Sequence, residues 1–240
     1  VYFANPGPDG KFNEKFFFHW EDWNNEKRTN EIVYDYKFIS SHFLNIPMAH
    51  QMVGWYTVAD KTDGILKVMR SYQYHAANAI GATVAKHDWS NNTVSVLGIL
   101  GGFVWHTTGS GKTMTSYKSA QLVADMHLSD KVIFLVDRIE LGTQSLEQYR
   151  NFADAKTEVQ ATENTHKLVT KLKSKNVKDT LIVTSIQKAS ELKNEVSEKD
   201  LEEINKKKIV FIIDECHRST FGTMMSDIRK TFIQTLYFGF

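Results

Sequence analysis

The 240-residue chain has a single cysteine, almost no net charge and no long hydrophobic run. One cysteine, Cys216, excludes an internal disulfide and fits a reducing cytoplasm. A formal net charge of +1 gives no overall field that demands nucleic acid, although a local basic groove can lie on a neutral protein. The most apolar stretches have the length of strands and end in polar residues, so the sequence predicts no membrane-spanning segment.

The composition is that of an ordinary folded domain. Hydrophobic residues make up 42% of the chain and charged residues 24%, which excludes a disordered tail. The sequence opens at Val1 without a methionine or a signal peptide, and it stops at Phe240 in what reads as the middle of a strand. From this pattern we expect a piece of a longer protein.

Two compositions meet near residue 65. Residues 1–64 are rich in aromatic side chains and asparagine and show no clean helical or strand period, so we expect the end of an upstream domain and a linker. Short apolar strands then alternate with amphipathic helices, with strands expected at 103–105, 131–136, 180–184, 208–213 and 235–240. This alternation predicts an α/β fold with a parallel sheet, buried strands and helices on both faces.

Three helical segments accompany these strands. A helix is expected over 111–127, and Leu146, Tyr149 and Phe152 mark one face of a second helix. The segment 191–208 mixes lysine and glutamate densely, so we interpret it as a solvated helical surface.

A glycine-rich loop, Thr108-Gly109-Ser110-Gly111-Lys112-Thr113, lies between the first strand and its helix. Glycines let successive N–H groups turn toward a β-phosphate, and the helix amino terminus adds partial positive charge. Lys112 would reach the β- and γ-phosphates, and the Thr113 hydroxyl would coordinate Mg²⁺. The loop therefore predicts an ATP site, although His106 stands where the strict P-loop pattern has its first glycine. The alternative is a glycine-rich turn that only caps a helix.

Two carboxylates, Asp214 and Glu215, follow directly after an apolar strand. Open α/β sheets bind ligands at the carboxyl ends of their strands. Asp214 suits the metal shell, and Glu215 suits the orientation or deprotonation of water. Acids that merely end a strand are the alternative, but the glycine-rich loop upstream argues against it. Cys216 reads as a small buried residue, and His217, without partners at zinc-binding spacing, as a residue that couples to the γ-phosphate.

With Asp214-Glu215-Cys216-His217 in place, the chain resembles the DExH helicases and translocases of superfamily 2. It is most similar to the motor (R) subunit of type I restriction enzymes. The resemblance rests on four stretches, 105–113, 136–138, 184–188 and 211–219, and covers residues 65–240 firmly and 1–64 only loosely. A histidine is the expected residue at position 106 in that family.

The resemblance implies that residues 65–240 form the first RecA-like motor domain, truncated at its C-terminal end. Residues 1–64 would be the C-terminal end of an upstream nuclease domain of the PD-(D/E)XK kind, with a linker. In such proteins Mg²⁺ and ATP drive movement along double-stranded DNA, and hydrolysis needs a second motor domain. The partners would be the methyltransferase (M) and specificity (S) subunits of the restriction complex.

The resemblance also implies roles for residues outside the two motifs. Gln73 would read the adenine, and Arg138, Thr184 and Ser185 would line the DNA path. Side chains at strand ends can hold phosphates, but a polar strand terminus is the alternative for each. Asp35-Tyr36-Lys37 looks like a nuclease D-x-K element, yet the family has its catalytic acids further upstream, so we expect a solvated amphipathic element there.

Three other functions stay open. An RNA helicase or a chromatin-type remodelling ATPase would share the motor fold, but Cys216 and the His-Thr-Thr before Gly109 argue against the common RNA-helicase patterns. A small-molecule kinase would need an acceptor pocket and a lid, and nothing after Thr113 looks like either. A non-catalytic binding fragment is the last alternative, and we expect nucleotide affinity without turnover from this piece alone.

Overall fold

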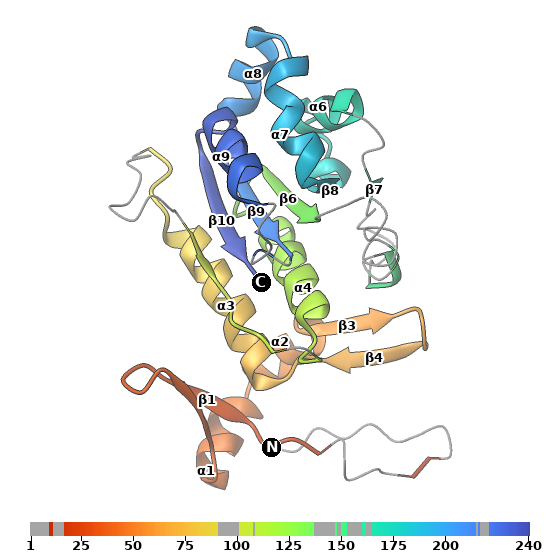
Figure 1. Cartoon of the computed structure of the whole chain (residues 1–240). Coiled ribbons are helices and arrows are strands. Elements are labelled where there is room, and N and C mark those ends of the chain that lie inside the picture. Colours follow the sequence, from red (N-terminus) through yellow and green to blue (C-terminus); the bar gives the residue numbers. More distant parts are fainter. Residues whose placement is uncertain are drawn as a thin grey trace. The chain divides into compact units, whose positions relative to one another are not determined.

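The computed structural model describes residues 10–11, 17–90, 101–107, 109–136, 147, 150–152, 160–161, 165–214, 216 and 221–240 (Figure 1). The chain divides into two compact units. The first comprises Val1–Val58 and Leu66–Ala76, and the second comprises Ala59–Ile65 and Ala77–Phe240. In the described ranges no helix is long and apolar enough to cross a membrane.

The first unit consists of short elements around an aromatic centre. Its complete elements are a hairpin of β1 (Glu21–Asn24) and β2 (Thr29–Ile32), α1 (Tyr36–Phe38), a π-helical turn (Ile39–Phe43) and α2 (Met48–Gly54). It also contains the start of β3 (Thr57–Asp60), the end of β4 (Ile65–Val68) and the start of α3 (Ser71–Lys86). Trp20 is buried, with its ring 4.4 Å from that of Phe43 and 5.5 Å from that of Tyr74, centroid to centroid. Elements of so few residues display no period, which is why the sequence pattern did not reveal them.

Asp35 has a local structural role in this unit. Its carboxylate accepts a hydrogen bond of 2.8 Å from the backbone N–H of Lys37 and so caps the amino end of α1. Both side chains are exposed, as expected of a solvated element.

The second unit is built on a parallel sheet with the strand order β5-β10-β9-β6-β8-β7. The strands are β5 (Gly101–Phe103), β6 (Lys131–Val136), β7 (Gln160–Ala161), β8 (Leu181–Ser185), β9 (Ile209–Ile213) and β10 (Thr235–Gly239). Every residue of β6, β8, β9 and β10 is buried, as continuously apolar runs predict. The predicted parallel α/β fold is confirmed, and β7, with only two residues, is the strand that the sequence pattern missed.

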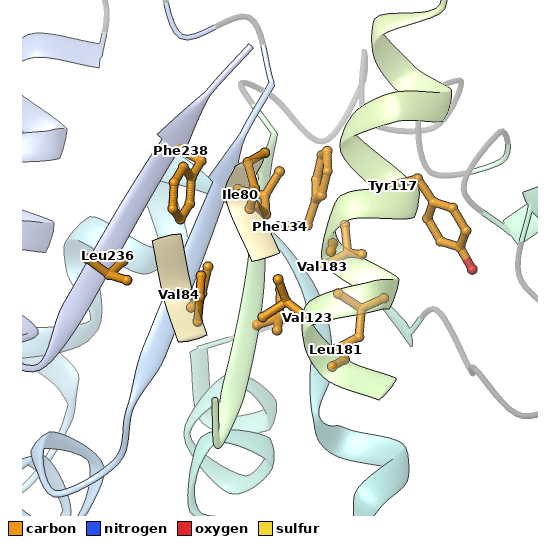
Figure 2. Close-up of a cluster of buried hydrophobic side chains, with 14 of the residues drawn as sticks. Ile80, Val84, Tyr117, Val123, Phe134, Leu181, Val183, Leu236 and Phe238 are labelled. Atoms are coloured by element: carbon orange, nitrogen blue, oxygen red, sulfur yellow. The ribbon is translucent and has the colours of Figure 1, made fainter. Parts of the chain in front are cut away.

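Helices cover both faces of this sheet. On one face α3 and α4 (Lys112–Asp125) supply Ile80, Val84, Tyr117 and Val123, which pack against Phe134, Val183, Leu236 and Phe238 (Figure 2). The other face is covered by α6 (Thr165–Lys173), α7 (Ile186–Glu195), α8 (Glu198–Asn205) and α9 (Phe221–Thr231). Strand side chains alternate between the two faces, so neighbours such as Ile133 and Phe134 belong to different cores.

For two of the predicted helical segments the structure gives only a partial match. Leu146 and Tyr149 lie outside the described residues, and Phe152 packs against the core, with its ring 5.9 Å from that of Tyr117 in α4, centroid to centroid. The charged segment 191–208 forms parts of α7 and α8, but it is not wholly a solvated surface, since Leu192 and Ile204 are fully buried.

The edge strand β5 differs from the buried strand that the sequence predicts. Phe103 is 75% exposed and Trp105 is 86% exposed. Only Val104 packs against the core, and its N–H donates to the carbonyl of Gly239 at 2.8 Å. Among the described residues β5 has a strand neighbour, β10, on one side only, so it is an edge strand and not a central one.

Gly101 fixes the approach of β5 to β10. Its φ of 124° lies in the region that only glycine adopts readily, and a Cβ there would lie 1.9 Å from the carbonyl oxygen of Tyr237. We predict that Gly101→Ala destabilises the chain by at least about 2 kcal/mol, because the clash is with backbone. Urea unfolding measures the loss. Gly102→Ala is the matched control, since nothing lies within 4 Å of its added Cβ, and an equal loss in both variants contradicts the prediction.

A buried lysine stands at the opposite, amino edge of the sheet. Lys131 is 2% exposed, and its Nζ donates to the carbonyl of Asp179 at 2.8 Å. Burial, and next the charge of Lys207, lower the pKa of Lys131 to about 8 from an ordinary value of 10.5.

This pKa makes the stability depend on pH in a defined window. Between about pH 8 and pH 10.5 the unfolded lysine still holds a proton that the folded lysine has lost, so stability rises with pH there. We predict that Lys131→Met, which keeps the apolar stem, flattens this rise, as measured by urea unfolding at pH 8 and pH 10. The exposed Lys206→Met is the control. An unchanged slope in Lys131→Met contradicts the assignment.

Candidate functional site at the carboxyl edge of the sheet

The glycine-rich loop forms a curled turn between β5 and α4. Gly109 and Gly111 have φ values of 79° and 80°, a left-handed conformation that glycine adopts without steric cost. Ser110 lies between them, and both its N–H and its hydroxyl donate to the carbonyl of Thr107, at 3.2 and 2.6 Å. Thr108 lies outside the described residues. The loop backbone is thus bent sharply just before the helix starts.

The helix α4 begins at Lys112, with Gly111 as its N-cap and no side chain capping it. The N–H and the hydroxyl of Thr115 both donate to the carbonyl of Gly111 at 3.0 Å, which anchors the first turn. Lys112 and Thr113 are half-buried in this turn. The amino terminus of a helix carries partial positive charge, which favours an anion at this end of α4.

Asp214 follows β9 at the same edge of the sheet. It is 9% exposed, and its N–H donates to the carbonyl of Leu135 at 3.2 Å. The turn is held further along by the N–H of Cys216, which donates to the carbonyl of Phe240 at 3.1 Å. Glu215 and His217 lie outside the described residues. Asp214 is therefore fixed where the carboxyl ends of parallel strands meet, which is the usual ligand edge of such sheets.

His106 lies where the chain passes from β5 to the loop. Its half-buried ring stands edge-on to that of Phe240, with centroids 6.2 Å apart and planes at 80°. Burial, and next the charge of Lys112, lower the pKa of His106 below its ordinary value of 6.5. The imidazole is consequently neutral at pH 7 and adds no second positive charge beside Lys112.

The predicted metal ligands suit Mg²⁺ in their chemistry. Thr113 offers a hydroxyl and Asp214 a carboxylate, and both come from the carboxyl edge of the sheet. Mg²⁺ takes oxygen ligands, and beside a nucleotide it needs only one or two side chains because phosphates and water complete its shell. The residues present fit such an ion.

Gln73 lies in the first unit, whereas the glycine-rich loop lies in the second. The side chain of Gln73 is 2% exposed, and its Oε1 accepts a hydrogen bond of 2.9 Å from the backbone N–H of Arg70. This bond satisfies a backbone donor at the start of α3. Recognition of an adenine by Gln73 stays a prediction.

Thr184 and Ser185 end β8 and are 3% and 2% exposed. The hydroxyl of Ser185 accepts a hydrogen bond of 3.4 Å from the N–H of Lys188 and caps α7. Arg138 lies outside the described residues. Contact of these residues with DNA stays a prediction.

Gly239 and Phe240 also belong to this edge, although sequence reasoning did not single them out. A Cβ on Gly239 would lie 2.6 Å from the Sγ of Cys216, so the glycine lets the turn after β9 pack closely on β10. A glycine inside an otherwise apolar strand signals such close approach, and the run Tyr237-Phe238-Gly239-Phe240 carries that signal.

The fold and these motifs are those of a P-loop ATPase domain, and comparison with known proteins agrees. The family model of the SWI2/SNF2 ATPase matches residues 72–240. An endonuclease subunit of a type I restriction enzyme from Staphylococcus saprophyticus is 40% identical over 232 residues, which are 97% of this chain and 23% of that protein. A putative type I restriction enzyme endonuclease subunit, C-terminal part, from Mycoplasma pneumoniae is 38% identical over 213 residues, or 89% of this chain and 99% of that protein.

Solved structures include one similar chain from a nuclease-deletion mutant of a type ISP restriction-modification enzyme with a DNA substrate mimic. It is 21% identical, with a TM-score of 0.48, over 72% of this chain and 17% of that one.

The family match over residues 72–240 shows that the chain belongs to the SWI2/SNF2 ATPase family. More particularly, the chain belongs to the family of type I restriction enzyme endonuclease subunits, as the sequence resemblance predicts. It spans about a quarter, 23%, of the length of its staphylococcal relative.

Proposed function

We propose that this chain is the ATP-binding part of a motor that moves double-stranded DNA through a type I restriction complex. The main observation behind the proposal is that a phosphate-binding type of loop and a carboxylate lie at the same edge of the sheet. A curled glycine loop precedes the amino terminus of α4, and the buried Asp214 follows β9. Phosphates and a divalent cation need these two groups together.

Each residue then has a defined task. The glycine-rich loop with Gly109, Ser110 and Gly111 would enclose the β-phosphate, and Lys112 would neutralise the γ-phosphate. Thr113 and Asp214 would hold Mg²⁺, which, when bound, draws charge from the β- and γ-phosphate oxygens. The lowered pKa of His106 keeps its imidazole neutral, so Lys112 is the positively charged side chain of this pair.

Hydrolysis is assigned to the turn after β9. Glu215 would orient a water molecule and take its proton as the water attacks the γ-phosphorus, and the bond to the ADP oxygen breaks. His217 would couple this event to the rest of the motor. A second motor domain outside this chain completes the site, and closure of the two domains drives stepping along DNA.

The partners follow from the family. Arg138, Thr184 and Ser185 are proposed to contact the DNA backbone, and Gln73 to read the adenine. The M and S subunits would complete the complex, with the S subunit recognising the DNA sequence. Residues 1–64 would be the end of a nuclease domain with a linker, and 65–240 the first motor domain. These assignments are supported by the type I restriction relatives.

The first test removes the charge at the cradle. We expect Lys112→Ala to lower ATP affinity of this chain by at least roughly tenfold, because a charge-assisted contact to phosphate is lost. In the intact subunit the same change should abolish DNA-stimulated hydrolysis. Binding of a fluorescent ATP analogue measures the first effect. Lys193→Ala, on the exposed side of α7, is the control, and unchanged ATP affinity in Lys112→Ala overturns the assignment.

A second test separates binding from chemistry. In an intact subunit with both motor domains, Glu215→Gln should keep ATP affinity but slow hydrolysis by a factor on the order of 10²–10⁴, since only proton transfer is lost. Phosphate release in the presence of DNA gives the rate. If Glu215→Gln fails to bind ATP, its role lies in binding instead. Asp214→Asn is the companion variant, and it should weaken the Mg²⁺ dependence of binding.

A further inference from the structure

The two halves of the site lie on strands that do not touch. β5 leads into the glycine loop and β9 leads into the turn of Asp214, and in the sheet order β10 lies between them. Phe103 is in register with Gly239, and Gly239 is in register with Ile213. The end of β10 therefore sets the spacing between the loop and the acidic turn.

Phe240, the residue after β10, contacts both halves. Its N–H donates to the carbonyl of Ile213 at 2.9 Å, and its carbonyl accepts from the N–H of Cys216 at 3.1 Å. These two bonds bracket Asp214 in the chain. On the other side, the buried ring of Phe240 meets the edge of His106, one residue before Thr107, to which the loop is hydrogen-bonded.

Gly239 makes this arrangement tight. A Cβ at that position would lie 2.6 Å from the Sγ of Cys216 and 3.9 Å from the Cβ of Phe103. Side chains from the β5 and β9 ends thus pack directly over the backbone of Gly239. A shift at the end of β10 is transmitted to both sides, because packed interiors have little free volume to absorb it.

We infer that Phe240 is a positioning residue that holds the acidic turn in register with the glycine loop through His106. The inference rests on the proposed function and deepens it. Contacts for the β-phosphate come from the loop itself, which is held by the hydrogen bonds from Ser110 to Thr107 and from Thr115 to Gly111. Groups for Mg²⁺ and the γ-phosphate come partly from the β9 turn. Phe240 therefore governs how well the site distinguishes ATP from ADP.

The experiment measures the affinities of this chain for Mg-ATP and Mg-ADP. Phe240→Leu keeps both backbone hydrogen bonds and an apolar side chain but loses the aromatic ring that meets His106. We expect ATP affinity to fall by roughly tenfold and ADP affinity to fall by clearly less, because Mg-ADP shares the metal ligands but lacks the γ-phosphate. Phe240→Tyr keeps the ring and should restore most of the ATP affinity.

Phe232→Leu is the matched control. Phe232 is 2% exposed, precedes β10 at its other end and packs against Phe211, so its substitution costs core packing without touching the site. It should leave the ratio of ATP to ADP affinity unchanged. A double variant, His106→Ala with Phe240→Leu, should have the same ATP affinity as Phe240→Leu alone. Both the single and the double variant lose the same contact, the one between the rings of His106 and Phe240.

The outcomes are distinguishable. Equal losses of ATP and ADP affinity in Phe240→Leu, an unchanged ratio, or the same ratio shift in Phe232→Leu would overturn the positioning role. Additive losses in the double variant would overturn the path through His106. A wild-type chain that binds neither nucleotide contradicts the proposed function itself. A wild-type chain that binds both, together with an unchanged ratio in Phe240→Leu, contradicts the positioning role alone.

Discussion

Parallel pairing of β10 with β5 on one side and β9 on the other is the constraint on which the site depends. Because all three strands run the same way, the glycine loop after β5 and Asp214 after β9 emerge at one edge. Their separation is fixed by a strand that contributes no predicted phosphate or metal ligand. Gly101 keeps β5 close to β10 without a side chain, and Gly239 does the same where Cys216 packs on β10.

Much of the fold is predictable from the sequence because its signals are local. The runs at 131–136 and 209–213 are apolar without interruption, and such runs mean strands buried on both faces. The loop from Gly109 to Lys112 is recognisable for the same reason, since two left-handed glycines and a helix start lie within four residues. Asp214 stands out because a carboxylate follows directly after a buried strand.

Features that depend on non-local contacts escaped prediction. Nothing in Phe103-Val104-Trp105 tells a buried strand from an edge strand, and only the structure shows that β5 is at the edge with Phe103 exposed. Phe240 reads as one more core residue until its bonds to Ile213 and Cys216 are seen. The elements of the first unit could not be predicted for a different reason. Apart from α3 they have three to seven residues each, which is too short for a period, and their aromatic centre depends on a contact between Trp20 and Tyr74, which are far apart in the sequence.

The site divides its chemistry between local and tertiary structure, and this division suits a motor. The glycine loop is held by local hydrogen bonds, which close on Thr107 and Gly111 within the loop and the first helical turn. A carboxylate brought from another strand responds to any change in the sheet. On the proposed function, the γ-phosphate is thus sensed by the part of the site that is coupled to the rest of the domain. Loss of that phosphate would then change the contacts of the acidic turn with the end of β10, whereas a purely local site would have no such connection to the sheet.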